Sequence, residues 1–300
     1  GAASFFVVKV ENRKDIEDTY EYIKNSIKSN WLAKEWENMD LLVEEYIDGD
    51  EVDIDIILQN GKIKFHTISD NFNKSKDKFF IDSGQAIPSG LPEIDQKKLI
   101  DLAEETLEKL AIQNAIIHYE AKISKGVAYP IEVNLRMGGD YIPSYIKGAW
   151  GISFVEYAAK IALGIHIKIE PPIQPLKYIV GWDLQPEFSG ILAELDIDEK
   201  LKIKKYLEDM RMMKEIGDPV LHPPEGYDSL GWITVSGDNL LDAQDNLREA
   251  LGYIKYKIVQ FDSESTLGKT ARKSSFSAAV IRKDRLIEKA KIEKVKLLSI

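Results

Sequence analysis

Three features that would point directly to a function are missing from this 300-residue sequence. Cysteine is absent, which excludes disulfides, thiolate nucleophiles and cysteine-ligated zinc. No apolar run approaches the roughly 20 residues that a membrane-spanning helix needs. The net charge is −10 and no basic tract occurs before the C-terminal tail, which argues against nucleic-acid binding by the body of the chain. We therefore expect a cytoplasmic protein that binds neither membranes nor nucleic acid.

The remaining composition, 44% hydrophobic and 30% charged, is typical of globular domains. The length suffices for two domains and a short extension. A proline-rich segment after residue 170 predicts a boundary, so we expect parts at 1–45, 46–170 and 171–262, and a basic tail of unknown role at 263–300. The chain opens on small residues and then an apolar segment, without Met, so we expect a piece of a longer protein.

Hydrophobic periodicity predicts both helices and strands, and hence an α+β fold. Expected helices cover residues 14–29, 93–110, the segment after Ser153, 198–210 and 240–254. Expected strands cover residues 5–10, 41–47, 51–58, 62–68, 179–184, 190–195, 232–235 and 256–261, with a hairpin over 118–136.

The hairpin is the most informative segment, because one of its faces is charged. Polar and apolar residues alternate on both arms, with the period of a half-buried strand. If Ser124 pairs with Ala128 across a three-residue loop, Glu120 lies opposite Glu132. Two carboxylates that face each other on a sheet repel, so a compensating group is expected.

The same register places His118 opposite Asn134. Two carboxylates and an amide oxygen are hard ligands suited to Mg²⁺, which takes its other ligands from water and phosphates. A solvated strand face, on which repulsion is weak, is the alternative. Arg136, two residues beyond Asn134, favours the metal interpretation.

A second acidic face is expected on residues 51–58. Asn60-Gly61 predicts a tight hairpin turn, which would put Asp55 opposite His66. His66 would then be a cross-strand partner rather than a ligand, and a structural role is favoured for Asp53 and Asp55.

Several of these motifs together resemble the ATP-grasp superfamily. They are the acidic hinge at 44–47, the Gly-Asp-Glu turn at 49–51, and an E-x-N-x-R strand with an upstream H-x-E within 118–139. The set is most similar to carboxylate–amine ligases of the L-amino acid ligase and carnosine-synthase-like type. Residues 181–262 are similar to the C-terminal domain of those ligases. The resemblance implies an ATP-grasp fold, with part of the lid over residues 1–45, followed by a small α+β domain.

The resemblance also implies how a nucleotide is bound. Glu44 would contact the adenine amino group, and the backbone of Glu45, Tyr46 and Ile47 would hydrogen-bond the purine edge. Glu51 would bind the ribose hydroxyls. Ser4, in the small-residue loop, would lie near phosphate.

The catalytic assignments follow from the same resemblance. Glu120, Glu132 and Asn134 would hold two Mg²⁺ ions, or Mn²⁺, on ATP. Arg136 would stabilise the acyl phosphate and the tetrahedral intermediate, and the Gly138-Gly139 backbone would receive a substrate carboxylate.

The implied activity joins a carboxylate, an amino acid, to an amine through an acyl phosphate. Two alternatives stay open: an ATP-grasp ligase of the carboxylase-like or purine-biosynthetic type, and a nucleotide-binding fragment without independent catalysis. The family's two phosphate-binding lysines would precede Gly1, and Lys9 does not match them. We therefore expect little turnover unless the missing N-terminal part or a second chain supplies them. The relatives suggest a homodimer.

Overall fold

The computed structural model describes residues 4, 6–29, 36, 38–73, 79–223, 226–262 and 297–299. Its helices are α1 (Ile16–Ser29), α2 (Glu93–Lys109), α3 (Ile142–Trp150), α4 (Phe154–Ala162) and α5 (Leu240–Leu251), with 3-10 turns η1 (Arg13–Asp15) and η3 (Glu199–Ile203). Its strands are β1 (Asp50–Gln59), β2 (Lys62–Asn73), β3 (Asp82–Ile87), β4 (Ala115–Ser124), β5 (Val127–Asn134), β6 (Tyr178–Leu184), β7 (Gly190–Ile197), β8 (Leu207–Met212), β9 (Pro219–Val220), β10 (Gly231–Gly237), β11 (Ile254–Gln260) and β12 (Leu297–Ser299).

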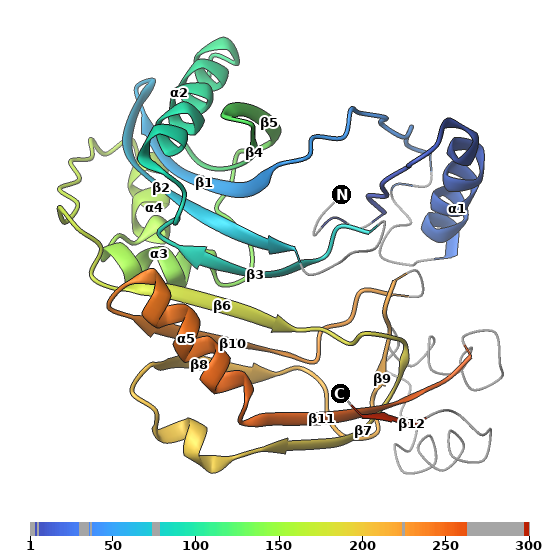
Figure 1. The fold of residues 1–300 in the computed structure, drawn as a ribbon. Helices are drawn as coiled ribbons and strands as arrows, with labels where there is room; N and C mark the ends of the chain where they lie inside the picture. Colours follow the sequence, from blue (N-terminus) through green and yellow to red (C-terminus); the bar gives the residue numbers. More distant parts are fainter. Residues whose placement is uncertain are drawn as a thin grey trace.

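Two antiparallel sheets organise these elements (Figure 1). The larger has the strand order β5-β4-β1-β2-β3-β6-β10-β8, and the smaller has the order β12-β11-β7-β9. The larger sheet includes strands from both sides of residue 170, because β3 pairs with β6. Within the described ranges, no helix has the length and apolar character that crossing a bilayer requires. The mixture of helices and antiparallel sheets confirms the predicted α+β class.

Some predicted elements are wrong. The segment 41–47 is not a strand, and its Leu42 and Val43 are largely exposed. Residues 198–210 form η3 and the start of β8 instead of a helix, because pairing with β10 overrides the local helical pattern. Of the strand predicted at 5–10, one isolated bridge from Val8 to Phe79 is present in the described residues.

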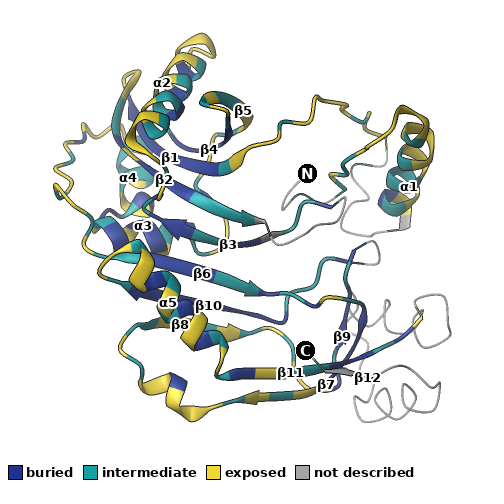
Figure 2. Ribbon diagram, viewed as in Figure 1, coloured by how far each residue is buried: buried dark blue, intermediate teal, exposed yellow. Residues whose placement is uncertain are grey.

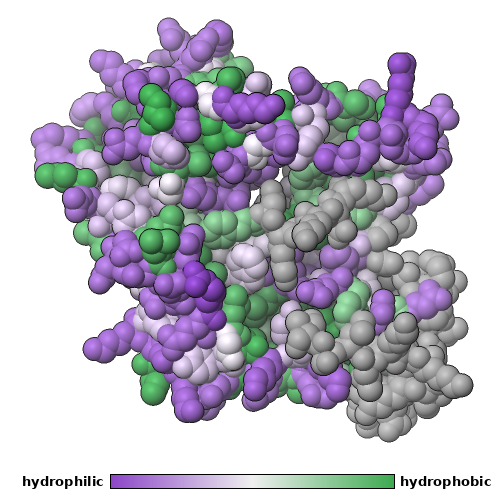
Figure 3. Space-filling model, viewed as in Figure 1, coloured by the Kyte–Doolittle hydropathy of each residue, from purple (hydrophilic) through white to green (hydrophobic). Residues whose placement is uncertain are grey.

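The two faces of the larger sheet differ because successive strand residues point to opposite faces. On one face, apolar residues of β1 and β4 pack against α2, and α5 covers the same face over β6 and β10. The apolar cluster between α2 and these strands includes Val52, Ile54, Ile56, Leu99, Ala103, Leu107, Ile117, Tyr119 and Ala121. Each fully buried Leu or Ile stabilises the fold by about 1.5–3 kcal/mol. Hydrophilic side chains dominate the outer surface over α1 and α2 (Figure 3).

The opposite face of the sheet carries α3 and α4 at one end and polar side chains at the other. β1 lies inside the sheet and is buried on both faces from Val52 to Gln59 (Figure 2). Its acidic residues Asp53 and Asp55 are therefore only 2% and 0% exposed. A buried carboxylate is costly unless it is paired or hydrogen-bonded, so this face needs compensating groups.

Gly181 of β6 lets α3 pack closely against the sheet. A Cβ at this position would lie 1.9 Å from the Tyr145 hydroxyl and 2.5 Å from Cζ2 of Trp232. Both side chains are nearly fully buried and cannot move away easily. The glycine is therefore required by packing.

We predict that Gly181→Ala destabilises the protein by about 1–3 kcal/mol, because the added methyl overpacks this contact. The urea midpoint of unfolding measures the effect. Gly139→Ala is the matched control, since a Cβ at Gly139 meets nothing within 4 Å. Equal midpoints for the two variants would contradict the packing argument.

Candidate functional site

The β4–β5 hairpin brings together the predicted metal ligands. Glu120 pairs with Glu132, and His118 pairs with Asn134, as the sequence predicts. The predicted pairing of Ser124 with Ala128 is wrong, because Ser124 pairs with Val127.

Two irregularities compensate for each other in this hairpin. The turn has two residues, Lys125 and Gly126, with φ of 50° and 75°. Positive φ at both central positions is typical of a type I′ hairpin turn. A register shift between Glu120 and Ala121 then leaves Ile131 without a cross-strand partner. The shorter turn and the bulge together give the predicted register at the acidic pair.

β1 extends the acidic face beyond the hairpin. Asp53 pairs with Glu120, and Asp55 pairs with His118. The predicted pairing of Asp55 with His66 is wrong, because a bulge at Ile57 and Leu58 shifts the register so that His66 faces Ile56. Asp53 and Asp55 thus belong to the candidate site, a role that the sequence analysis did not favour.

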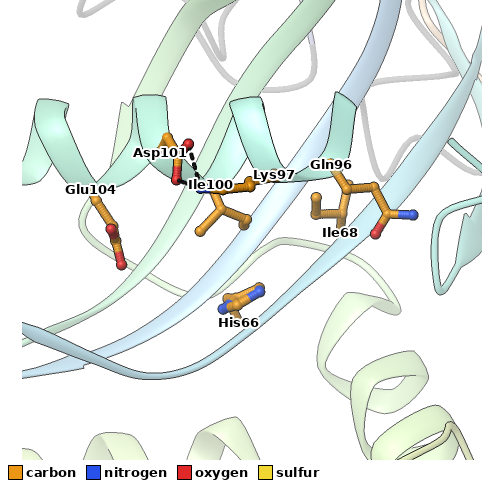
Figure 4. A pocket seen from close by; sticks show the side chains of 7 residues that line it. All are labelled: His66, Ile68, Gln96, Lys97, Ile100, Asp101 and Glu104. Carbon is orange, nitrogen blue, oxygen red and sulfur yellow. Dashed lines mark hydrogen bonds and ion pairs between the residues drawn. The ribbon is translucent and has the colours of Figure 1, made fainter. Parts of the chain in front are cut away.

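His66 instead lines a shallow cavity of about 300 Å³ on the opposite face of the sheet (Figure 4). In Figure 4 its ring points from β2 towards α2, which contributes the polar side chains of the cavity. The lining residues are His66, Ile68, Gln96, Lys97, Ile100, Asp101 and Glu104. Because the sheet separates this cavity from the acidic face, it is not part of the candidate site.

His118 is the centre of the buried charges. Its Nδ1 lies 3.0 Å from Oδ1 of Asp55, and its Nε2 lies 3.9 Å from Asp53 and 3.8 Å from Glu120. Burial alone would lower the pKa of His118, but the hydrogen bond to Asp55 and the charges of the acids raise it to about 9. His118 therefore lies among three acidic side chains on one face, and its hydrogen bond to Asp55 favours its protonated form.

Asp53 is held by two amides. Nδ2 of Asn71 donates to one of its oxygens at 2.9 Å, and Nε2 of Gln85 donates to the other at 2.7 Å. Burial raises the pKa of Asp53 to about 8, although the positive charge of His118 opposes the rise. Gln85 thus takes part in the network from β3, three strands away from β4.

The side-chain oxygens at the outer edge of the acidic face suit a Mg²⁺ ion that also binds phosphate. Nδ2 of Asn134 lies 3.4 Å from Oε1 of Glu120, and the carboxylate of Glu132 is exposed. In the part of the chain that the structure describes, no three His, Asp or Glu side chains group tightly enough to hold an ion alone. Two carboxylates and an amide leave ligand positions for phosphate oxygens and water, which is how Mg²⁺ binds at nucleotide sites.

The predicted nucleotide residues lie next to this edge. Glu51 forms an ion pair with Lys122 at 3.0 Å. Nζ of Lys122 also lies 5.4 Å from the ring centre of Tyr46 and 5.5 Å from that of Phe80. Lys9 approaches Tyr46 at 4.2 Å. The sequence analysis missed Lys122, although its alternation with His118 and Glu120 on β4 was a usable signal.

The other predicted nucleotide residues make fewer contacts. Glu44 and Glu45 are exposed, and Ile47 is half-buried. Ser4 has a φ of 51°, and its carbonyl accepts a hydrogen bond from the backbone N–H of Val7 at 3.0 Å. No hydrogen bond or ion pair in the described residues joins Ser4 to the hairpin.

The segment after β5 borders the acidic face. Arg136 is exposed, and its Nη1 donates to the carbonyl of Met137 at 2.8 Å. Gly138 is buried, and a Cβ there would lie 2.9 Å from Nδ1 of His118. Gly139 is exposed with open space around it. The two glycines therefore differ, since one packs on the histidine and the other leaves backbone accessible.

We predict that the metal-free protein loses stability as the pH rises from 6.5 to 9.5. The pKa values of Asp53 and His118 are both raised, so the folded state binds more protons than the unfolded state over this range and loses stability as the pH rises through it. Urea unfolding in EDTA measures a loss of roughly 1 kcal/mol or more. Asp53→Asn makes the dependence of the unfolding free energy on pH shallower, because it removes one of the two groups. Stability that is constant or rises over this range would contradict the assignment.

Comparisons with known proteins show what the chain is similar to. Residues 1–144 match the family model of the ATP-grasp domain. Carnosine synthase 1 of Gallus gallus is 29% identical over 140 residues, which are 47% of this chain and 14% of that protein. The ATP-grasp enzyme fsqD of Aspergillus fumigatus is 23% identical over 267 residues, covering 71% of this chain and 46% of that enzyme. The chain thus spans less than half the length of these relatives.

Solved structures extend the likeness beyond residue 144. The L-amino acid ligase from Bacillus licheniformis gives a TM-score of 0.70 at 21% identity, covering 83% of this chain and 61% of the ligase. Phosphoribosylglycinamide synthetase from Anaerococcus prevotii gives 0.62 at 16% identity, covering 82% and 68%. At these identities the likeness concerns the fold. The chain therefore has an ATP-grasp fold, and its residues 1–144 belong to the ATP-grasp domain family.

Proposed function

We propose that this protein is an ATP-dependent ligase that joins an amino acid carboxylate to an amine through an acyl phosphate. The observation that carries the proposal is the pairing of Glu120 with Glu132, with Asn134 and Arg136 following on the same strand and loop. Two opposed carboxylates are destabilising unless a cation compensates them. The relatives named carnosine synthase 1 and L-amino acid ligase support the ligase class.

The acidic face would hold the reacting end of ATP. Mg²⁺ bound by Glu120, Glu132 and Asn134 would neutralise phosphate charge and polarise the transferred phosphoryl group. We propose two ions, for which Mn²⁺ can substitute. The protein's contribution is positioning, because phosphoryl transfer needs little covalent chemistry from it. His118, fixed by Asp55, supports Glu120 from beneath.

The nucleoside end would lie over Lys122 and its aromatic neighbours. Lys122 holds the carboxylate of Glu51 in place at 3.0 Å, ready to accept the ribose hydroxyls. Tyr46 offers an apolar face to the purine, and the backbone from Glu45 to Ile47 offers hydrogen bonds to its edge. Glu44 would accept a hydrogen bond from the adenine amino group.

The carboxylate substrate would lie between Arg136 and the two glycines. A guanidinium presents paired N–H donors to an oxyanion, so Arg136 can stabilise both the acyl phosphate and the tetrahedral intermediate. The exposed backbone of Gly139 can donate to a substrate carboxylate. Amine attack on the acyl phosphate then forms the C–N bond and releases phosphate.

We predict that Mg²⁺-ATP raises the melting temperature of the protein, because a ligand that binds only the folded state stabilises it. Glu132→Gln abolishes most of this rise, since it removes a metal ligand. Glu108→Gln, at an exposed acid of α2 on the opposite face, retains it. A full rise in the Glu132 variant would show that the nucleotide binds elsewhere.

We predict that ADP release requires both an amino acid and an amine, and that Arg136→Ala lowers kcat by roughly 100-fold. The Mg²⁺-ATP melting shift should persist in this variant, because Arg136 acts on the reacting carboxylate. Lys147→Ala, which removes an exposed cation of α3, serves as the control. ADP release with bicarbonate alone would instead favour a carboxylase-like ligase, and release without any acceptor would contradict the proposal.

A further inference from the structure

A row of three side chains lies on the same sheet face as the candidate site, on strands that the proposed mechanism does not use. Trp232 of β10 pairs with Asp183 of β6 on one side and with Arg211 of β8 on the other. Directly opposed residues of antiparallel strands point to the same face. A carboxylate, an indole and a guanidinium therefore lie side by side, with the charged residues' Cα atoms about 10 Å apart.

An aromatic stack covers the middle of this row. The ring of Tyr141 stacks on Trp232 with 4.9 Å between centroids and 14° between planes. Trp232 is fixed from beneath, because its Nε1 donates to the Tyr145 hydroxyl at 2.6 Å and to Thr234 at 2.9 Å. Tyr141 follows Gly138 by three residues, and Gly138 packs on His118. The stack is thus connected to the candidate site by about 10 Å of chain at most.

Asp183 is a half-buried carboxylate held by neutral groups. It accepts hydrogen bonds from the hydroxyl of Ser229 and, at 3.1 Å, from Nε2 of Gln185. No cation contacts it in the described residues, and burial raises its pKa. It also lines a small cavity of about 30 Å³, together with Ile81, which precedes β3, and residues of the loop before β10. A cavity of this size exceeds the roughly 10–15 Å³ that one water molecule needs, and so has room for an ammonium group.

Arg211 is exposed and forms no hydrogen bond or ion pair within the described ranges. Asp209 lies two residues before it on the same face, but no ion pair joins the two. Asp183 and Arg211 are likewise not paired with each other. The row therefore presents separated negative and positive groups on either side of a rigid apolar surface.

We propose that Asp183 and Arg211 bind a small zwitterionic substrate, with its ammonium in the cavity at Asp183 and its carboxylate at Arg211, across the Tyr141–Trp232 stack. The proposal rests on the proposed ligase function, because it assigns this zwitterion as one of the two substrates. Asp183 and Arg211 flank the stack, so each can pair with one end of a molecule that carries both charges, and the stack would contact its side chain.

Saturation-transfer NMR on the full chain with Mg²⁺-ADP tests the proposal. The probes are the twenty common L-amino acids and β-alanine, in which the charges are further apart. The best binder is then compared with its N-acetyl derivative, which lacks the ammonium, and with its decarboxylated amine. Four variants are measured: Asp183→Asn and Arg211→Gln, with Asp245→Asn and Lys205→Gln as controls at exposed charges.

We expect at least one amino acid to bind, and its Kd to rise at least tenfold in Asp183→Asn and in Arg211→Gln. Asp183→Asn should leave the Kd of the N-acetyl derivative unchanged, and Arg211→Gln that of the amine. The controls should stay within twofold of the unsubstituted protein. Melting curves of each variant identify any loss of folding.

Two outcomes would overturn the subsite. One is that no probe binds, and the other is that both variants bind the amino acid within twofold of the unsubstituted protein. Measuring Mg²⁺-ATP binding on the same samples distinguishes failure of the subsite from failure of the proposed function. If the nucleotide binds and no amino acid does, the subsite is wrong and the nucleotide site stands. If the nucleotide does not bind, the proposed function is wrong as well.

Discussion

Crowding of negative charge on one face of the larger sheet is the constraint on which the candidate site depends. Three adjacent strands contribute to it, and their acids are Glu51, Asp53, Asp55, Glu120 and Glu132. Burying unpaired carboxylates would cost several kcal/mol each. The chain compensates the inner acids with His118, Lys122 and two amides. For the outer pair, Glu120 and Glu132, the compensation that we propose is Mg²⁺.

The position of β1 inside the sheet makes this compensation rigid. Because β1 is flanked by β4 and β2 and covered on both faces, Asp53 and Asp55 have almost no access to water and depend on fixed partners. His118 then links the buried acids to Glu120 and to Gly138. The imidazole of His118 therefore contacts a buried acid, a predicted metal ligand and the predicted substrate loop at the same time. This arrangement suits a reaction that relies on positioning.

Local patterns predict the site better than they predict its surroundings. The pairing of Glu120 with Glu132 follows from strand alternation and is confirmed, although a shorter turn and a bulge produce it. Bulges have no clear local signal, and this is why the predicted partner of Asp55 is wrong. The stack of Tyr141 on Trp232 joins positions 91 residues apart in sequence. Long-range pairing of this kind is decided by the assembled sheet, not by neighbouring residues.

The central claim is that Glu120, Glu132 and Asn134 hold the divalent ion that accompanies ATP. A crystal structure with Mn²⁺ and a non-hydrolysable ATP analogue, with anomalous diffraction to locate the ion, tests it most directly. The account predicts an anomalous peak within coordination distance of both carboxylates, with phosphate oxygens completing the shell. A Mn²⁺-nucleotide complex bound away from these carboxylates, or an analogue bound with no peak between them, would contradict it.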